Sequence, residues 1–325
     1  MFSRLIKLSS ASVAAFGVLG AVAGAAGPPP PTATNGHAVQ QVAAGLATPT
    51  SFAFGAGRVF EGDGGSQDGK TKGGVFVLAN GAGTRLAGSP PFVAGLAWRK
   101  NVLYVSAGSM LLAWTGWNGT SFSKRKTIYK APKGFTGFNG IAFGANGRLY
   151  AGVSLASNND FKPEKAPYAF DVLSFTAAGK DLKVEATGLR QPWQMVFPKG
   201  SSSPLVSDLG QDGGAKNPPD FIYRIKRGSA AGFPGCNWTK PKACKGFVKP
   251  FQMFAPHTSA MGLGIIGKSL FISEFGTQQV VSMPVSGGKV TPLLTGFVAP
   301  IVGLATNQGW VYVGELTGQV FRVRP

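Results

Sequence analysis

A short pattern of small and apolar residues recurs six times along the chain. Each copy opens with a small–apolar–small run such as Gly95–Trp98, passes a glycine-containing turn, and ends in an apolar run such as Leu103–Ala107. Short runs rich in β-branched and aromatic residues, bounded by glycine, are typical of strands. The first halves are 51–54, 95–98, 140–143, 194–197, 262–265 and 303–306, and the second halves are 59–63, 103–107, 149–153, 204–208, 270–274 and 311–315.

Six such repeats predict an all-β fold, a six-bladed β-propeller built of four-stranded blades. Small residues on the first strand suit the crowded centre of a ring, and apolar second strands suit sheets that are covered on both faces. No 3.6-residue apolar pattern persists beyond the N-terminal leader, so we expect few helices.

The ends of the chain predict how the ring closes. A lead-in at Val39–Pro49 recurs at Val184–Pro192 and Val290–Pro300, each time where the outer strand of a preceding blade is expected. The first copy has no preceding blade, and the chain ends on the strand-like run Gln319–Val323. We therefore expect 38–46 to pair with the C-terminal blade and remove its free edge, which makes 38–325 a single domain.

The N-terminus resembles an export signal. Residues 1–27 combine Arg4 and Lys7 with a weakly apolar run and A-x-A cleavage sites, and 28–37 form a proline-rich spacer. The run is too short and too rich in small residues for an integral membrane span. We expect a protein that is secreted, periplasmic or held at the cell surface after cleavage of the leader; an uncleaved leader that serves as an anchor is the alternative.

Composition narrows the class of protein and of partner. Hydrophobic residues make up 44% and charged residues 14%, with 48 Gly and 23 Pro, which excludes a disordered chain or a coiled coil. Lys and Arg number 32 against 13 acids, a net charge of +19. This excess favours anionic partners such as a cell-wall polymer, but the bases are scattered in short groups, which favours solvated outer loops over one adhesive basic face. No nucleic-acid-binding motif accompanies the basic groups, so we expect no nucleic acid partner.

The two cysteines are Cys236 and Cys244. In an exported chain this spacing predicts one disulfide that closes a short loop. Two cysteines and two distant histidines, His37 and His257, cannot form a tetrahedral zinc site.

Acids recur at one position of the repeat. The fifth residue of the second half is acidic in four copies: Asp63, Asp208, Glu274 and Glu315. In a ring these carboxylates would gather at one mouth of the central channel, and the alternative is that each hydrogen-bonds its own turn. His257 precedes a predicted inner strand, where its imidazole could take a proton from a substrate hydroxyl or could be an ordinary loop residue.

Five segments, in this order, resemble the glucose/sorbosone dehydrogenase family. They are Ala186–Trp193, Asp208–Gly214, Gly232–Pro234 before a cysteine, Pro256–Leu263 and Leu294–Phe297. The likeness spans most of 38–325.

The resemblance implies a quinoprotein that holds pyrroloquinoline quinone (PQQ) and Ca²⁺ at the channel mouth and oxidises a sugar or a related alcohol or aldehyde by hydride transfer. Arg190 matches an arginine that contacts the quinone, and Gln191 stands where Asn is usual. Gly210 and Gln211 match the loop that binds the metal, with Gln211 also facing the cofactor. His257 matches a histidine of the family pattern, so Arg190 and His257 are the implied catalytic residues.

Departures from the family pattern keep a second function open. The loop Ser273–Gln278 carries neither the His nor the Arg of the family, and Thr50 or Ser51 stands where an arginine is often found. Fewer arginines mean fewer bidentate contacts to the carboxylates of PQQ. The alternative is a non-catalytic propeller of the same ancestry that binds a glycan or a cell-wall component.

Overall fold

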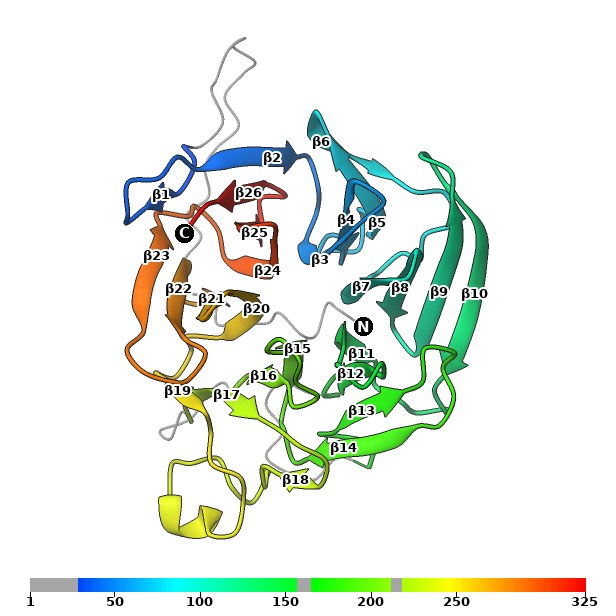
Figure 1. Ribbon diagram of the computed structural model, residues 1–325. Helices are drawn as coiled ribbons and strands as arrows, with labels where there is room; N and C mark the ends of the chain where they lie inside the picture. Colours follow the sequence, from blue (N-terminus) through cyan, green and yellow to red (C-terminus); the bar gives the residue numbers. More distant parts are fainter. Residues whose placement is uncertain (1–28, 157–164, 212–217) are drawn as a thin grey trace.

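The computed structural model describes residues 29–156, 165–211 and 218–325, and the predicted export signal lies outside them. Its sheets divide into six blades of four strands around one axis (Figure 1). Within the described ranges the helical element is one short 3-10 helix, η2 (Pro241–Cys244). The prediction of an all-β, six-bladed propeller is confirmed.

Each blade is an antiparallel sheet whose first strand lies nearest the axis. Blade 1 consists of β3 (Pro49–Gly55), β4 (Arg58–Asp63), β5 (Gly74–Ala79) and β6 (Gly81–Arg85). Blade 2 consists of β7 (Gly95–Arg99), β8 (Val102–Ala107), β9 (Met110–Trp117) and β10 (Phe122–Lys130). Blade 3 consists of β11 (Phe138–Phe143), β12 (Leu149–Val153), β13 (Val172–Phe175) and β14 (Lys183–Thr187). Blade 4 consists of β15 (Pro192–Val196), β16 (Leu205–Asp208), β17 (Asp220–Arg224) and β19 (Gln252–Phe254). Blade 5 consists of β20 (Ala260–Ile266), β21 (Ser269–Glu274), β22 (Gln279–Pro284) and β23 (Thr291–Thr295). Blade 6 consists of β24 (Ile301–Asn307), β25 (Trp310–Glu315), β26 (Val320–Val323) and β2 (Gln40–Ala44).

The inner strands explain the small residues of the repeat. Each inner strand contacts the next around the ring. A Cβ atom on Gly95 would lie 2.8 Å from the Cα of Gly140, and one on Gly140 would lie 2.8 Å from the carbonyl oxygen of Trp193. Cβ atoms do not approach backbone this closely, so glycine lets neighbouring inner strands come together.

The hydrophobic core is divided among the spaces between neighbouring blades. Between blades 1 and 2, for example, Phe60 packs with Trp114 and Phe122, and similar clusters fill the other five spaces. Both faces of each sheet are therefore covered, which is why the second strands are apolar almost throughout.

Ring closure follows the prediction. Strand β2 pairs antiparallel with β26, with Gln40 opposite Arg322, and also pairs parallel with β6 of blade 1. Structure begins before β2: β1 (Thr32–Ala33), in the segment expected as a spacer, pairs with β23 of blade 5. The N-terminal segment thus contributes backbone pairing to blades 5, 6 and 1.

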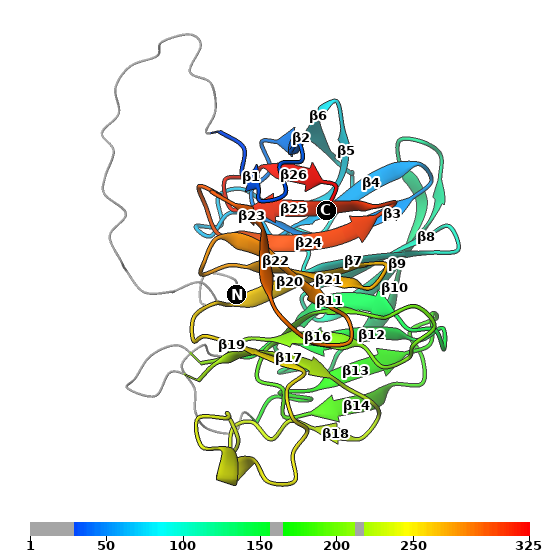
Figure 2. The ribbon, with the colours of Figure 1, turned by 60° about the vertical axis from the view of Figure 1, so that its left-hand side comes forward.

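Between β17 and β19 the chain leaves blade 4 on a long excursion that carries β18 (Ser229–Ala230) and η2 (yellow in Figures 1 and 2). Strand β18 pairs with β14 of blade 3. Cys236 and Cys244 are bonded, with Cα atoms 5.0 Å apart, which confirms the predicted disulfide. No helix in the described part of the chain is long and apolar enough to cross a membrane.

Candidate functional site

The four repeat acids lie at one end of the ring. Each stands opposite the first residue of its own inner strand, and the inner strands run in one direction around the axis; we call this end the mouth. The pairs are Pro49 with Asp63, Pro192 with Asp208, Ala260 with Glu274 and Ile301 with Glu315.

Two of these acids hold the loop that enters their blade. The carboxylate of Asp63 accepts hydrogen bonds from the backbone N–H groups of Ala47 (2.8 Å) and Thr48 (3.1 Å), and that of Asp208 accepts them from Arg190 (3.2 Å) and Gln191 (2.6 Å). Burial raises the pKa of Asp208 to about 7, because the bonds from these amides offset only part of the desolvation.

The other two acids are also engaged locally. Glu274 accepts hydrogen bonds from Thr277 and from the Gln279 side chain (2.7 Å). Glu315 accepts them from Thr317 and from Gln319 (3.2 Å), and burial raises its pKa. The four acids therefore share one rim, but each uses carboxylate oxygens to hold a turn or an incoming loop.

The loop before β15 places the residues matched to cofactor contacts. The side-chain oxygen of Gln191 accepts the Leu155 N–H (2.8 Å), which ties blade 4 to blade 3. The Arg190 guanidinium is almost fully buried and donates to the carbonyls of Leu209 (3.0 Å) and Gly210. Arg190 thus lies against the loop that the sequence matched to a metal site.

Asp220 links this loop to the one that carries His257. One oxygen of Asp220 accepts the Gly210 N–H (2.7 Å) and the other accepts the Ser259 N–H (2.7 Å). His257 is exposed and has a left-handed backbone (φ 64°). The Arg190 and His257 loops are therefore neighbours on the same rim. Sequence analysis missed Asp220, because it starts a third strand and falls outside the repeated positions.

A small pocket opens beside Arg190, and apolar residues such as Leu209, Phe221 and Phe233 line part of it. Arg190, Asp208, Gln211, Tyr223 and Asn237 line it, and its free space of about 10 Å³ is about what one ordered water needs. Gln211 is 2% exposed, and its Nε2 amide has no hydrogen-bond partner in the described part of the chain. The pocket has room for one functional group of a ligand, and Gln211, which carries this buried donor, is one of its lining residues.

Apolar side chains lie next to these polar groups. Trp193, Met261, Phe275 and Val302 form a buried cluster at the starts of the inner strands of blades 4 to 6 and at the end of β21. Leu209 and Leu316 pack against the cluster, and each follows a repeat acid. Sequence analysis missed this apolar cluster, although an apolar residue directly follows the repeat acid in blades 4 to 6 and could have indicated it.

The residues at Gly210 do not fit a bound calcium ion. The carbonyl that would ligate the metal already accepts a hydrogen bond from the positive guanidinium of Arg190, which would repel a cation. Among the described residues no three His, Cys, Asp or Glu side chains gather as a metal site. The Nε2 donor of Gln211 and the positive charge of Arg190 do suit the carbonyl and carboxylate oxygens of a quinone such as PQQ.

Comparisons with known proteins agree on the fold. No family model and no curated protein matches the chain. The PQQ-bound aldose sugar dehydrogenase of Streptomyces coelicolor superposes with a TM-score of 0.70 at 16% identity, covering 90% of this chain and 99% of that one. A Trichoderma reesei protein of Carbohydrate-Active Enzymes Family AA12 gives a TM-score of 0.73 at 16% identity, covering 91% and 98%. A glucose dehydrogenase gives 0.71 at 16% identity, covering 88% and 99%.

The structural neighbours thus include PQQ-dependent sugar dehydrogenases, as the sequence motifs predicted. At this level of identity the likeness establishes the propeller fold that the chain shares with them, and function has to be argued from the site.

Proposed function

We propose that this chain is an exported sugar dehydrogenase that holds PQQ at the mouth and oxidises a sugar or a related alcohol or aldehyde. One observation carries the proposal: Gln211 lines a pocket together with Arg190, and its buried Nε2 donor has no partner among the described residues. A buried donor without a partner is destabilising by about 1–3 kcal/mol, so an acceptor oxygen of a ligand would be favoured there. The fold is that of proteins described as sugar dehydrogenases.

The residues of the mouth would have different roles in binding the cofactor and in catalysis. When bound, PQQ would supply the hydride acceptor. Arg190 and Gln211 would hold an oxygen of the cofactor, and the cluster around Trp193 and Phe275 would exclude water from beneath it. His257 would take the hydroxyl proton of the substrate as the hydride leaves. Calcium has no part in this proposal, because the Gly210 carbonyl is bonded to Arg190.

Export is part of the proposal. The leader-like 1–27 and the disulfide both suit an oxidising compartment outside the cytoplasm. There the positive charge of the chain would favour contact with an anionic cell-wall polymer.

Cofactor retention and turnover test the proposal separately. Purified protein is mixed with PQQ and passed through gel filtration, and quinone absorbance should remain with the protein. Sugar-dependent reduction of a redox dye should follow. R190A should lose the bound quinone, whereas H257A should keep it and turn over slowly. A wild-type protein that retains no quinone would contradict the proposal.

A second candidate is a glycan-binding propeller without catalysis. It is favoured by the hydrogen bonds that engage all four repeat acids and Gln191 in holding loops. In that case the protein should bind an oligosaccharide in a glycan array or by calorimetry, and PQQ should produce no dye reduction with any sugar.

A further inference from the structure

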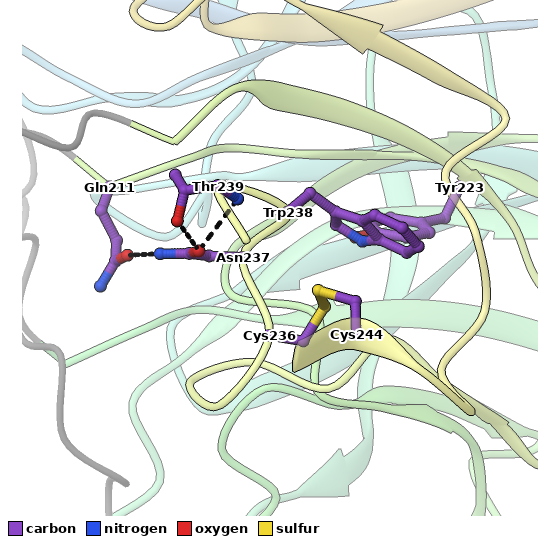
Figure 3. The surroundings of a disulfide bond; sticks show 7 residues. All are labelled: Gln211, Tyr223, Cys236, Asn237, Trp238, Thr239 and Cys244. Atoms are coloured by element: carbon purple, nitrogen blue, oxygen red, sulfur yellow. Dashed lines mark hydrogen bonds between the residues drawn. A yellow bond between two sulfur atoms is a disulfide. The ribbon is translucent and has the colours of Figure 1, made fainter. Parts of the chain in front are cut away.

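The excursion from blade 4 places one side-chain amide against the pocket. Asn237 follows the disulfide residue Cys236 directly, and its Nδ2 donates to the side-chain oxygen of Gln211 at 3.3 Å (Figure 3). Its Oδ1 accepts two hydrogen bonds from Thr239, one from the backbone N–H at 3.3 Å and one from the hydroxyl at 2.7 Å.

This arrangement determines which way both amides point. A backbone N–H can only donate, so the oxygen of Asn237 must face Thr239 and its NH₂ must face Gln211. Gln211 then has to present its oxygen to Asn237, which turns its Nε2 away from Asn237 (Figure 3). That Nε2 atom is buried and has no partner within 29–156, 165–211 and 218–325. The donor character of the pocket is thus set by Thr239 through Asn237.

The loop that carries Asn237 is held on both sides. Cys236 and Cys244 are buried, and the Cys236 N–H bonds the Gly232 carbonyl at 2.8 Å. On the other side, the Trp238 indole N–H donates to the hydroxyl of Tyr223 at 3.2 Å. These contacts hold the backbone of Asn237 in place, and the bonds from Thr239 hold its side-chain amide.

We propose that Asn237, held by the disulfide loop, is a specificity-determining residue that fixes the Gln211 amide as a donor, so that the pocket takes a carboxylate or carbonyl oxygen. This inference rests on the ligand site in the proposed function and adds the chemical group that the site selects. Arg190 supplies positive charge at the same pocket. The raised pKa of Asp208, about 7, leaves much of that carboxyl uncharged near neutrality, which limits repulsion of an anion.

The test inverts the amide while preserving its shape. In N237D the carboxylate can only accept hydrogen bonds. Thr239 still donates to one carboxylate oxygen, and the other carboxylate oxygen needs a donor, which only the Nε2 of Gln211 can supply. The Gln211 amide therefore turns over, and its side-chain oxygen then faces the pocket. Affinity is measured by calorimetry for two carboxylate probes, PQQ and D-glucuronate. We expect at least a tenfold loss for the bound probe, persisting in 0.5 M NaCl, where exposed charges are screened within a few ångströms. T239V keeps the backbone N–H and should change affinity less than threefold.

A second variant tests the role of the loop. C236S/C244S should weaken binding of the same probe by about three- to tenfold, with near-wild-type circular dichroism. The outcomes separate this inference from the quinone proposal. Loss of glucuronate binding in N237D, in a protein that never binds PQQ, would support the inference and contradict the quinone function. PQQ binding unchanged in N237D would overturn the inference and leave the quinone function standing. A wild-type protein that binds neither probe would overturn the inference.

Discussion

The carboxyl group of Glu61 is buried where the other blades place an aliphatic side chain. Glu61 is the third residue of the second half of the repeat, and its counterparts are Val105, Ala151, Val206, Ile272 and Val313, all fully buried. It shares a strand face with Val59, which packs in the cluster between blades 6 and 1. In the described part of the chain neither carboxyl oxygen of Glu61 has a hydrogen-bond partner of normal geometry, and the Thr50 backbone offsets only part of the rise in its pKa. The Glu61 side chain is therefore as buried as its aliphatic counterparts, but its carboxyl group does not provide the favourable free energy that a buried apolar group provides.

Replacing Glu61 by leucine should stabilise the protein. An unsatisfied buried polar group is destabilising by about 1–3 kcal/mol, and leucine fills nearly the same volume with apolar atoms. We expect the free energy of unfolding to rise by about 1–3 kcal/mol, or roughly 2–10 °C in Tm for a domain of this size. Urea denaturation followed by tryptophan fluorescence measures the change.

The pH dependence gives a second signature. Burial, followed by repulsion from Asp63, raises the pKa of Glu61, so the folded state binds this proton more tightly than the unfolded chain does. This contribution to stability is present below the ordinary pKa of 4.5 and is lost as the pH rises through the folded-state pKa. E61Q cannot titrate and should lose less stability than the wild type between pH 5 and pH 8.

A matched control comes from Glu185, which is also buried but has partners. It accepts hydrogen bonds from Ser174 and from Arg227 (2.9 Å). Burial tends to raise its pKa, but these bonds outweigh it and hold the pKa below its ordinary value. E185L should therefore destabilise the protein by about 1–3 kcal/mol, opposite in sign to E61L. A loss of stability in E61L, or equal pH slopes in E61Q and the wild type, would refute the reasoning.

Three further predictions concern the ring and its mouth. G95A should destabilise the ring, because the added Cβ would lie 2.8 Å from the Cα of Gly140; a drop in Tm measures it, and an unchanged Tm would contradict the close-approach argument. A chain lacking 29–46 loses β2, which pairs with both β26 and β6, so the edges of these two strands become exposed. We expect this chain to aggregate, as measured by light scattering, or to lose several degrees in Tm, as measured by calorimetry. D208N should flatten the pH dependence of stability between pH 5 and pH 8, because the folded-state pKa of about 7 makes the wild type lose stability over that interval; a slope equal to that of the wild type would show that Asp208 titrates normally.

The architecture was predictable because it rests on repeated residues. Six copies of one pattern indicated six blades, and the lead-in at Val39–Pro49 without a preceding blade indicated the closing strand. Glycines such as Gly95 marked the crowded centre because the neighbouring backbone leaves no room for a Cβ. These features depend on residue type and order, which a sequence displays directly.

The mouth was only partly predictable because its chemistry depends on which partner each polar atom finds. The sequence placed Asp208 and Arg190 near each other, but it did not show that Arg190 bonds the Gly210 carbonyl and so disfavours calcium there. Nor did it reveal Asp220, whose two oxygens join loops distant in sequence. The direction of the Gln211 amide depends on Asn237, which lies in a loop on the far side of β17.

Glu61 and Gln211 both contain buried polar atoms without partners, yet the two have different consequences. Glu61 is fully buried between blades 6 and 1, so a ligand has no route to it and only a change of residue removes the cost of its burial. Gln211, whose Nε2 has no partner among the described residues, lines a pocket at the mouth, where we propose that a ligand oxygen satisfies it. The first penalty is permanent and lowers stability, whereas the second is relieved on binding and so adds to affinity. This difference in access is the physical reason to place function at Gln211 and not at the more deeply buried Glu61.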